Sequence, residues 1–167
     1  AQARAAGIEP HADMNPILLK PSGLGRMQVL ALGKPVGLMD AREYYARGGE
    51  MRALAHAAYD RLAARFEVVV LEGAGSPAEI NLRAQDFTNM AMAEYAEARC
   101  LLVADIERGG VCASILGTLE LMPNPTHARM AGVLINKFRG DATLLDSGIA
   151  EIVVEGVLCR HPTLPRA

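Results

Sequence analysis

Three short apolar runs, each followed at once by acidic, amide or glycine residues, constrain the fold of this chain more than any other feature. They occupy residues 68–71, 100–104 and 130–135, and stretches with helical spacing separate them. Strands that alternate with helices form right-handed βαβ units, in which the strands are parallel and buried. The sequence therefore predicts an α/β fold with a mainly parallel sheet that is flanked by helices.

The composition agrees with this architecture. Apolar residues make up 51% of the 167 residues but aromatic residues only 4%, so aliphatic side chains, alanine and methionine must fill the core. Such side chains suit helices that pack on a parallel sheet. A chain of this length can bury one substantial core, and we expect a single domain.

The rest of the chain predicts further elements. A strand at 27–32, a turn at Gly33 and Lys34, and a short extended piece at 36–38 predict a small hairpin. Asp40 can cap a helix that continues to about residue 65 and is broken near Gly48 and Gly49. The remaining predictions are helices at 86–98, 110–122 and 142–153 and a last short strand at 156–158.

Charge and cysteine content argue against several classes of protein. The net charge of -2 predicts neither a nucleic-acid partner nor binding to an anionic membrane. No apolar run approaches the roughly 20 residues that span a bilayer, so we expect no membrane contact. Three widely spaced cysteines indicate neither a disulfide framework nor a zinc site, and they favour reduced thiols in the cytoplasm. The chain starts at Ala1 within a helical pattern, and we interpret it as part of a longer protein.

Polar residues follow each of the three apolar runs directly. Glu72 follows the first, Asp105 the second and Asn136 the third. Taken singly, each would be an ordinary solvated loop residue. The carboxyl ends of parallel strands meet at one edge of a sheet, where open α/β sheets bind ligands. We therefore expect these three side chains to converge on one site.

The residue types at these strand ends suit phosphate and metal chemistry. Glu72 offers the hard oxygen ligand that Mg²⁺ prefers, and Arg108 is a planar cation for a carboxylate or a phosphate. Asn136 could recognise an adenine edge by paired hydrogen bonds. Four glycines have backbone N–H groups that could approach anionic oxygens, namely Gly73, Gly75, Gly109 and Gly110. A predicted helix starts at the last two, and its positive end would also favour an anion.

A complete phosphate-binding loop is absent from the sequence. No GxxxxGK[ST] pattern occurs, and Gly33 with Lys34 lacks both the preceding loop and the following hydroxyl. We interpret Lys34 as a turn lysine. Cys112, near a predicted helix start, has no partner that would make it reactive, and we interpret it as a small packed thiol.

Four motifs extend this interpretation. They are EGAGSPAEINLR at 72–83 with the following Asp86 and Asn89, LVADIERGGV at 102–111, INKFRGD at 135–141, and AAGIEPHADMNPILLKPSG at 5–23. Together they strongly resemble the cobyric acid synthase family, across nearly the whole chain. SPAEINL with ADIERGG is far more specific than a lone glycine-rich loop.

The resemblance implies an activity. The family uses ATP and glutamine-derived ammonia to amidate four peripheral carboxylates of adenosylcobyrinic acid a,c-diamide, a corrin, and so makes adenosylcobyric acid for cobalamin. Activation passes through an acyl phosphate. The family's synthetase domain is similar to dethiobiotin synthetase, a P-loop NTPase-like fold that uses Mg²⁺, and a glutamine amidotransferase domain follows it.

The resemblance also implies roles for individual residues. Glu72 matches a position that helps to hold Mg²⁺, and Asn136 matches the adenine-reading position, with Lys137 beside it. Asp105 and Arg108 match a second loop of the site, for substrate or intermediate contacts. The loops near the reacting phosphate and substrate comprise Gly73, Ala74, Gly75 and Ser76, and then Gly109 and Gly110.

This chain departs from the family in two large respects. The Walker A unit that begins the synthetase domain is absent, and so is the amidotransferase domain with its nucleophilic cysteine. We therefore interpret residues 1–167 as a partial synthetase domain and expect the isolated chain to be inactive. Two alternatives stay open, namely a non-catalytic regulatory or interaction module derived from a P-loop fold, and a related P-loop ATPase. A homo-oligomer is also possible.

Overall fold

The computed structural model describes residues 1–152, and the chain divides into two compact units. The N-terminal unit is Ala1–Glu72, and the C-terminal unit begins at Gly73. The predicted strand at 156–158 lies outside the described residues, as does the last residue of the predicted helix at 142–153. Within residues 1–152, no helix has the length and apolar character that a membrane span requires.

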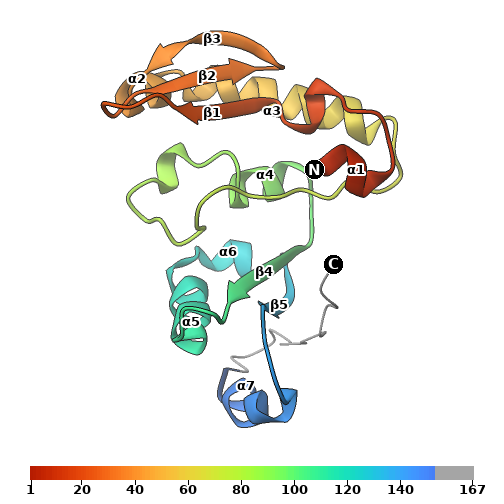
Figure 1. Cartoon of the computed structure of the whole chain (residues 1–167), viewed down its shortest axis with the longest axis vertical. Helices are drawn as coiled ribbons and strands as arrows, with labels where there is room; N and C mark the ends of the chain where they lie inside the picture. Colours follow the sequence, from red (N-terminus) through yellow and green to blue (C-terminus); the bar gives the residue numbers. More distant parts are fainter. Residues whose placement is uncertain (153–167) are drawn as a thin grey trace. The chain divides into compact units, whose positions relative to one another are not determined.

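The N-terminal unit contains a three-stranded antiparallel sheet, in which the chain order β1, β2, β3 is also the spatial order (Figure 1). The strands are β1 (Ile17–Pro21), β2 (Met27–Ala31) and β3 (Lys34–Met39). Leu32 and Gly33 join β2 to β3 with φ values of 47° and 79°, as a tight two-residue hairpin turn requires. The predicted hairpin is confirmed, but its turn lies one residue earlier than predicted, because Lys34 is already the first residue of β3. Strand β1 adds a third strand to the hairpin.

Three helices accompany this sheet: α1 (Gln2–Ala6), α2 (Ala41–Ala46) and α3 (Gly48–Ala63). Asp40 caps α2 as predicted, because its Oδ1 accepts from the Glu43 N–H at 2.8 Å while Glu43 Oε2 accepts from the Asp40 N–H at 2.8 Å. This reciprocal pair is a capping box. Arg47 separates α2 from α3, so the predicted break near Gly48 is confirmed.

An ion pair between a buried carboxylate and a half-exposed arginine ties the start of the N-terminal unit to α3. Asp13, in the short 3-10 helix η1 (Ala12–Met14), accepts from Arg61 Nε at 3.0 Å and from Arg61 Nη2 at 2.6 Å. The Asp13 side chain is only 4% exposed. The Arg61 guanidinium holds the pKa of this carboxyl below its ordinary value, and His11 and Arg65 act in the same direction. A carboxylate this deeply buried needs such a partner.

The predicted strand at 68–71 is wrong in this structure. The segment belongs to no helix or strand, and the side chains of Val68 and Val70 are 76% and 90% exposed. A β-strand is stable only when a neighbouring strand takes up its backbone hydrogen bonds. The described residues pair no strand with this run, so its apolar composition alone does not make it one.

The C-terminal unit contains a parallel pair of strands, β4 (Cys100–Asp105) and β5 (Met130–Asn136), joined through α5 (Val111–Leu121) and the short α6 (Asn124–His127). These strands and α5 agree with the prediction and confirm an α/β unit with a parallel sheet. The prediction of a mainly parallel sheet needs correction, because the antiparallel sheet of the N-terminal unit holds more of the described strands. The remaining elements are η2 (Arg83–Gln85), α4 (Met90–Tyr95), η3 (Ala142–Leu145) and α7 (Asp146–Ile152).

Helix α4 is shorter than the predicted helix at 86–98. Asp86 Oδ1 accepts from the N–H groups of Thr88 and Asn89, each at 3.0 Å. A carboxylate that bonds to the next backbone groups stabilises a turn in competition with a helix. The helix therefore begins only at Met90.

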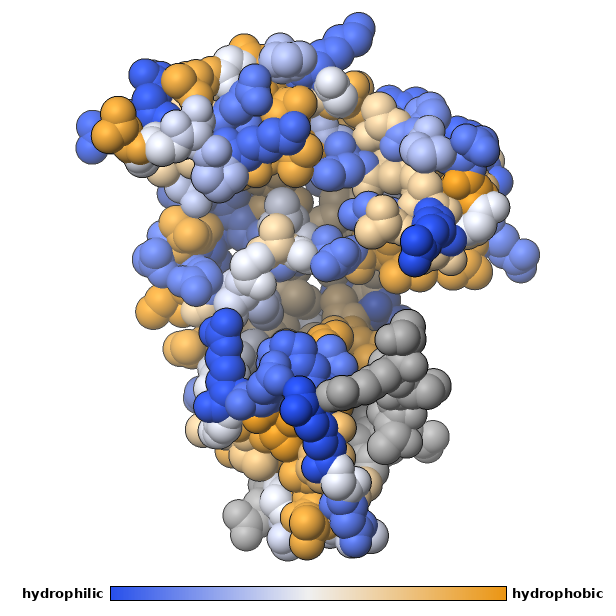
Figure 2. Space-filling view, viewed as in Figure 1, coloured by the Kyte–Doolittle hydropathy of each residue, from blue (hydrophilic) through white to orange (hydrophobic). Residues whose placement is uncertain are grey.

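The core of the C-terminal unit lies where α5 and α7 meet β4 and β5. Ile115 of α5 is fully buried, and Val133 of β5 and Ile152 of α7 are each 2% exposed. Cys112 is partly buried against this core, which confirms its interpretation as a packed thiol. Apolar side chains also reach the surface, as the orange atoms in Figure 2 show. Leu24 of the N-terminal unit and Leu101 of the C-terminal unit are among the exposed ones.

Candidate functional site

The carboxyl ends of β4 and β5 lie side by side. Their register pairs Asp105 with Asn136, the last residue of each strand, and the Ile106 N–H donates to the Asn136 carbonyl at 3.3 Å. The sequence predicted this convergence because both strands are parallel and end in a polar residue. The structure confirms it for these two residues.

Two consecutive glycines then turn the chain into α5. Gly109 and Gly110 have φ values of 75° and 67°, in the left-handed region that favours glycine. Gly110 is the N-cap residue of α5. Asp105 supports the start of this turn, because its Oδ1 accepts from the Glu107 N–H at 2.9 Å. The turn thus places backbone N–H groups of a helix start beyond the end of β4, as predicted.

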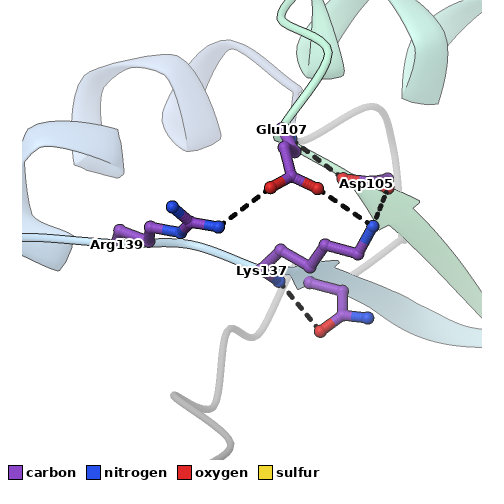
Figure 3. Close-up of polar contacts among 5 residues, drawn as sticks. Asp105, Glu107, Lys137 and Arg139 are labelled. Atoms are coloured by element: carbon purple, nitrogen blue, oxygen red, sulfur yellow. Dashed lines mark hydrogen bonds and ion pairs between the residues drawn. The ribbon is translucent and has the colours of Figure 1, made fainter. Parts of the chain in front are cut away.

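Two carboxylates and two cations form a continuous ion network at the ends of the two strands (Figure 3). Lys137 Nζ donates to Asp105 Oδ2 at 2.7 Å and to Glu107 Oε2 at 3.2 Å. Arg139 Nη2 donates to the other oxygen of Glu107, Oε1, at 2.9 Å. The network joins residues that are about 30 positions apart in the chain, and its formal charges cancel.

The network shifts the pKa values of its two central members. The hydrogen bond from Lys137 and then that from the Glu107 N–H hold the pKa of Asp105 below its ordinary value, with Arg108 contributing in the same direction. The hydrogen bonds to Asp105 and Glu107 raise the pKa of Lys137. Both side chains are substantially exposed, 39% for Asp105 and 47% for Lys137, so both stay charged at neutral pH and are accessible to a ligand.

Lys137 adopts an unusual backbone conformation for a residue with a side chain, with φ of 61°. Its N–H donates to Asn136 Oδ1 at 2.8 Å. With this backbone conformation, the Lys137 side chain extends toward Asp105 (Figure 3). Non-glycine residues with positive φ tend to persist where the surrounding structure over-determines them, often in functional sites.

Asn136 and Arg108 are exposed at the same edge. The Oδ1 of Asn136 is engaged by Lys137, and its Nδ2 donates to no described residue. Arg108 forms no hydrogen bond or ion pair with any residue in 1–152, but it lies near enough to Asp105 to lower its pKa. The edge therefore presents an amide donor and a third cation beside the neutral network.

The loop at 73–76 has a defined backbone in the C-terminal unit. Gly75 has φ of 69°, and the Ala78 N–H donates to Ser76 Oγ at 3.2 Å. Asn89 Nδ2 donates to the Ala74 carbonyl at 2.8 Å. These contacts fix a short glycine-containing loop of the kind that can approach an anion closely.

Glu72 is not placed as we expected. It ends the N-terminal unit, it does not follow a strand, and it makes no hydrogen bond or ion pair with the described residues. An exposed, unpaired carboxylate has the donor atoms that Mg²⁺ takes, and Mg²⁺ often uses one or two protein carboxylates together with water and phosphate. Among residues 1–152, however, no group of three or more His, Cys, Asp or Glu could hold a metal.

The sequence analysis did not predict the ion-network roles of Glu107 and Arg139, or the contact of Asn89 with the loop at 73–76. Glu107 and Arg139 lie within the motifs at 102–111 and 135–141, but their roles depend on contacts across the two strand ends. Two acidic residues at the end of one parallel strand and two basic residues at the end of its neighbour are the signal that could have indicated an ion network. For Asn89, the signal was the Asp86 turn chemistry three residues earlier.

The chain is similar to curated cobyric acid synthases. That of Desulforudis audaxviator is 56% identical over 151 residues, which are 90% of this chain and 30% of that protein. That of Citrobacter koseri is 54% identical over 151 residues, 90% of this chain and 30% of the relative. That of Sorangium cellulosum is 51% identical over 148 residues, 89% of this chain and 28% of the relative.

The chain thus spans 28–30% of the length of these curated relatives. No protein-family model matches it. No solved structure matches it.

Proposed function

We propose that the chain, which is 51–56% identical to the three cobyric acid synthases named above, belongs to that family and forms part of an ATP-dependent amide ligase of cobalamin biosynthesis. The ligase would convert adenosylcobyrinic acid a,c-diamide into adenosylcobyric acid with glutamine-derived ammonia. The observation that carries this proposal is the accessible ion network of Asp105 and Lys137 at two parallel strand ends. A ligand site at such an edge is typical of α/β proteins.

The proposed reaction activates a corrin carboxylate by phosphoryl transfer. A carboxylate oxygen attacks the γ-phosphorus of ATP, the bond to the ADP oxygen breaks, and an acyl phosphate forms. Ammonia then attacks the acyl carbon, a proton leaves the nitrogen, and inorganic phosphate departs. Such chemistry depends mainly on positioning and on neutralising the charge of the transferred group. The proposed fold is P-loop NTPase-like, similar to dethiobiotin synthetase.

The exposed cations of the network supply charges of the required sign. Lys137 shares its ammonium between two carboxylates at 2.7 and 3.2 Å, so an anionic oxygen of substrate or phosphate would compete with them for it. Asp105 keeps Lys137 charged and oriented, and Arg108 adds a guanidinium that is unpaired among residues 1–152 at the same edge. We assign these residues to substrate and phosphate contacts.

The loops and the amide complete the proposed assignments. The N–H groups at 73–76 and at Gly109 and Gly110 would face the reacting phosphate and the substrate, and Asn136 would pair with the adenine edge through its Nδ2 and Oδ1. Glu72 would hold Mg²⁺ together with phosphate oxygens and water, and the ion would neutralise phosphate charge. The Lys137 N–H already occupies one acceptor position of Asn136, and an amide oxygen can accept a second bond.

The test uses the protein that carries this chain, with Mg-ATP, the corrin diamide and either glutamine or ammonia. We expect amidated corrin and ADP from the wild type, and at least a 10²-fold loss of kcat in Asp105→Asn, the size expected for one electrostatic group of an active site. Lys34→Gln is the control, since Lys34 is exposed at the β2–β3 turn. Wild-type protein that binds neither nucleotide nor corrin would favour the non-catalytic module instead.

The isolated chain provides a second comparison. We expect it to form no amidated corrin with ATP and free ammonia. Product from the isolated chain would contradict its assignment as a part that needs the rest of the protein.

A further inference from the structure

Two side chains between η2 and α4 form a clamp, which we call the Asp86–Asn89 clamp. Asp86 Oδ1 accepts from the N–H groups of Thr88 and Asn89, each at 3.0 Å, and from Thr88 Oγ1 at 3.3 Å. Asn89 Nδ2 lies 3.4 Å from the same oxygen. The carboxylate thus holds Asn89 in one place at the start of α4.

Asn89 reaches from this clamp to the loop at 73–76. Its Nδ2 donates to the Ala74 carbonyl at 2.8 Å. The approach is so close that a Cβ on Gly73 would clash with Asn89 Oδ1 and lie 3.3 Å from Asn89 Cγ. Gly73 does not have a positive φ. Its lack of a side chain therefore serves this contact rather than a left-handed backbone.

From these contacts we infer that Asn89 is a positioning residue for the loop at 73–76, and that Gly73 is required because the Asn89 amide occupies the space of its side chain. The inference rests on the proposed function, in which this loop contacts the reacting phosphate and substrate. Glycine-containing loops have many accessible conformations, so a donor that fixes one carbonyl also limits where the neighbouring N–H groups point.

The consequence for activity follows from geometry. A displacement of about 1 Å in a positioning element can cost about 10²-fold in rate. Among the described residues, the Asn89 side chain donates to the Ala74 carbonyl and to Asp86. Its loss should therefore lower kcat while leaving the KM for ammonia nearly unchanged. A role confined to stability would instead lower the unfolding temperature without changing kcat of the folded fraction.

The experiment uses the protein that carries this chain and compares Asn89→Ala with Asn89→Asp. Aspartate is nearly isosteric with asparagine but cannot donate to the Ala74 carbonyl when ionised. We expect kcat to fall about 10- to 100-fold in both variants. Gln28→Ala, which removes an exposed amide of β2, should leave kcat unchanged. Full activity in folded Asn89→Asp would overturn the inference, because filling the space would then suffice.

A double-mutant cycle tests the contact itself. We expect Gly73→Ala to lower kcat strongly in the wild-type background and much less in the Asn89→Ala background, since the clash is then removed. Equal losses in the two backgrounds would overturn the inference. Failure of both Asn89 variants to fold would also overturn it, because the residue would then serve the whole unit. If the proposed function is wrong, wild-type protein makes no amidated corrin, an outcome distinct from every result above.

Discussion

The two units of this chain place their charged side chains in opposite ways. In the N-terminal unit, Asp13 of η1 is 4% exposed and pairs with Arg61 of α3. In the C-terminal unit, Asp105 is 39% exposed and pairs with Lys137 at the ends of two parallel strands. The first pair has the surroundings of a structural contact, and the second is open to a ligand.

The difference follows from sheet topology. In an antiparallel meander, neighbouring strands run in opposite directions. The carboxyl ends of successive strands therefore lie at opposite ends of the sheet, and the loops that follow them do not meet. Parallel strands send every following loop to the same edge. The predicted site residues Asp105 and Asn136 therefore meet in the C-terminal unit. In the N-terminal unit, β1 and β2 each end in a connection to an antiparallel neighbour, and β3 leads into the N-cap of α2.

The largest expected effect on stability lies in the core of the C-terminal unit. Ile115 is fully buried, and its replacement by alanine should lower the free energy of unfolding by about 2–5 kcal/mol, from lost burial and an internal cavity. Denaturant unfolding measures this. Leu116→Ala, on the more exposed side of the same helix, is the matched control, and an equal loss there would contradict the assigned packing.

The comparison of the two ion pairs predicts a second effect, on activity. Lys137→Gln should lower kcat for corrin amidation by about 10²-fold and leave the unfolding temperature almost unchanged, because exposed ion pairs contribute little to stability. Steady-state kinetics and thermal unfolding of the same sample check both parts. A large fall in unfolding temperature with normal kcat would reverse the roles given to the two pairs.

Asp13→Asn should show the opposite behaviour, with a lower unfolding temperature, on the order of 4 °C for a contact of this kind in a chain of this size. Glu9→Gln, an exposed acid near it in sequence, is the control. No change in unfolding temperature for Asp13→Asn would show that the pair of Asp13 and Arg61 is not structural.

The pH dependence separates the pairs further. Arg61 lowers the folded-state pKa of Asp13 below its ordinary 3.8, so the stabilisation is complete above that value and is lost as the pH falls through the lowered pKa. Stability of wild type and Asp13→Asn, measured from pH 7 down to pH 2, should therefore converge at the acidic end. A difference that grows on acidification would contradict the assigned shift.

The smallest effect is expected at the run 68–71. Val70 is 90% exposed, and Val70→Thr in this chain should change the free energy of unfolding by less than about 0.5 kcal/mol. A loss as large as that of Ile115→Ala would show that the run is buried as a strand after all.

Several elements could be predicted from the sequence because their causes are local. The Asp40 capping box spans three residues, the Leu32 and Gly33 turn spans two, and the apolar runs of β4 and β5 carry their own strand preference. The polar strand ends at Asp105 and Asn136 could also be predicted, because parallel topology dictates where they meet. The four motifs likewise predicted the similarity to cobyric acid synthases that the comparisons then found.

Other features depend on partners that are distant in the chain, and only the tertiary structure decided them. Asp13 meets Arg61 across 48 residues, and Lys137 meets Asp105 across 32. The run at 68–71 has strand composition but gains no paired neighbour in this structure, and β-propensity acts only through such neighbours. The contact between Asn89 and Ala74 likewise depends on how a loop folds back, which no local pattern encodes. Local chemistry thus determined which elements could form, and long-range packing determined which charges and amides meet.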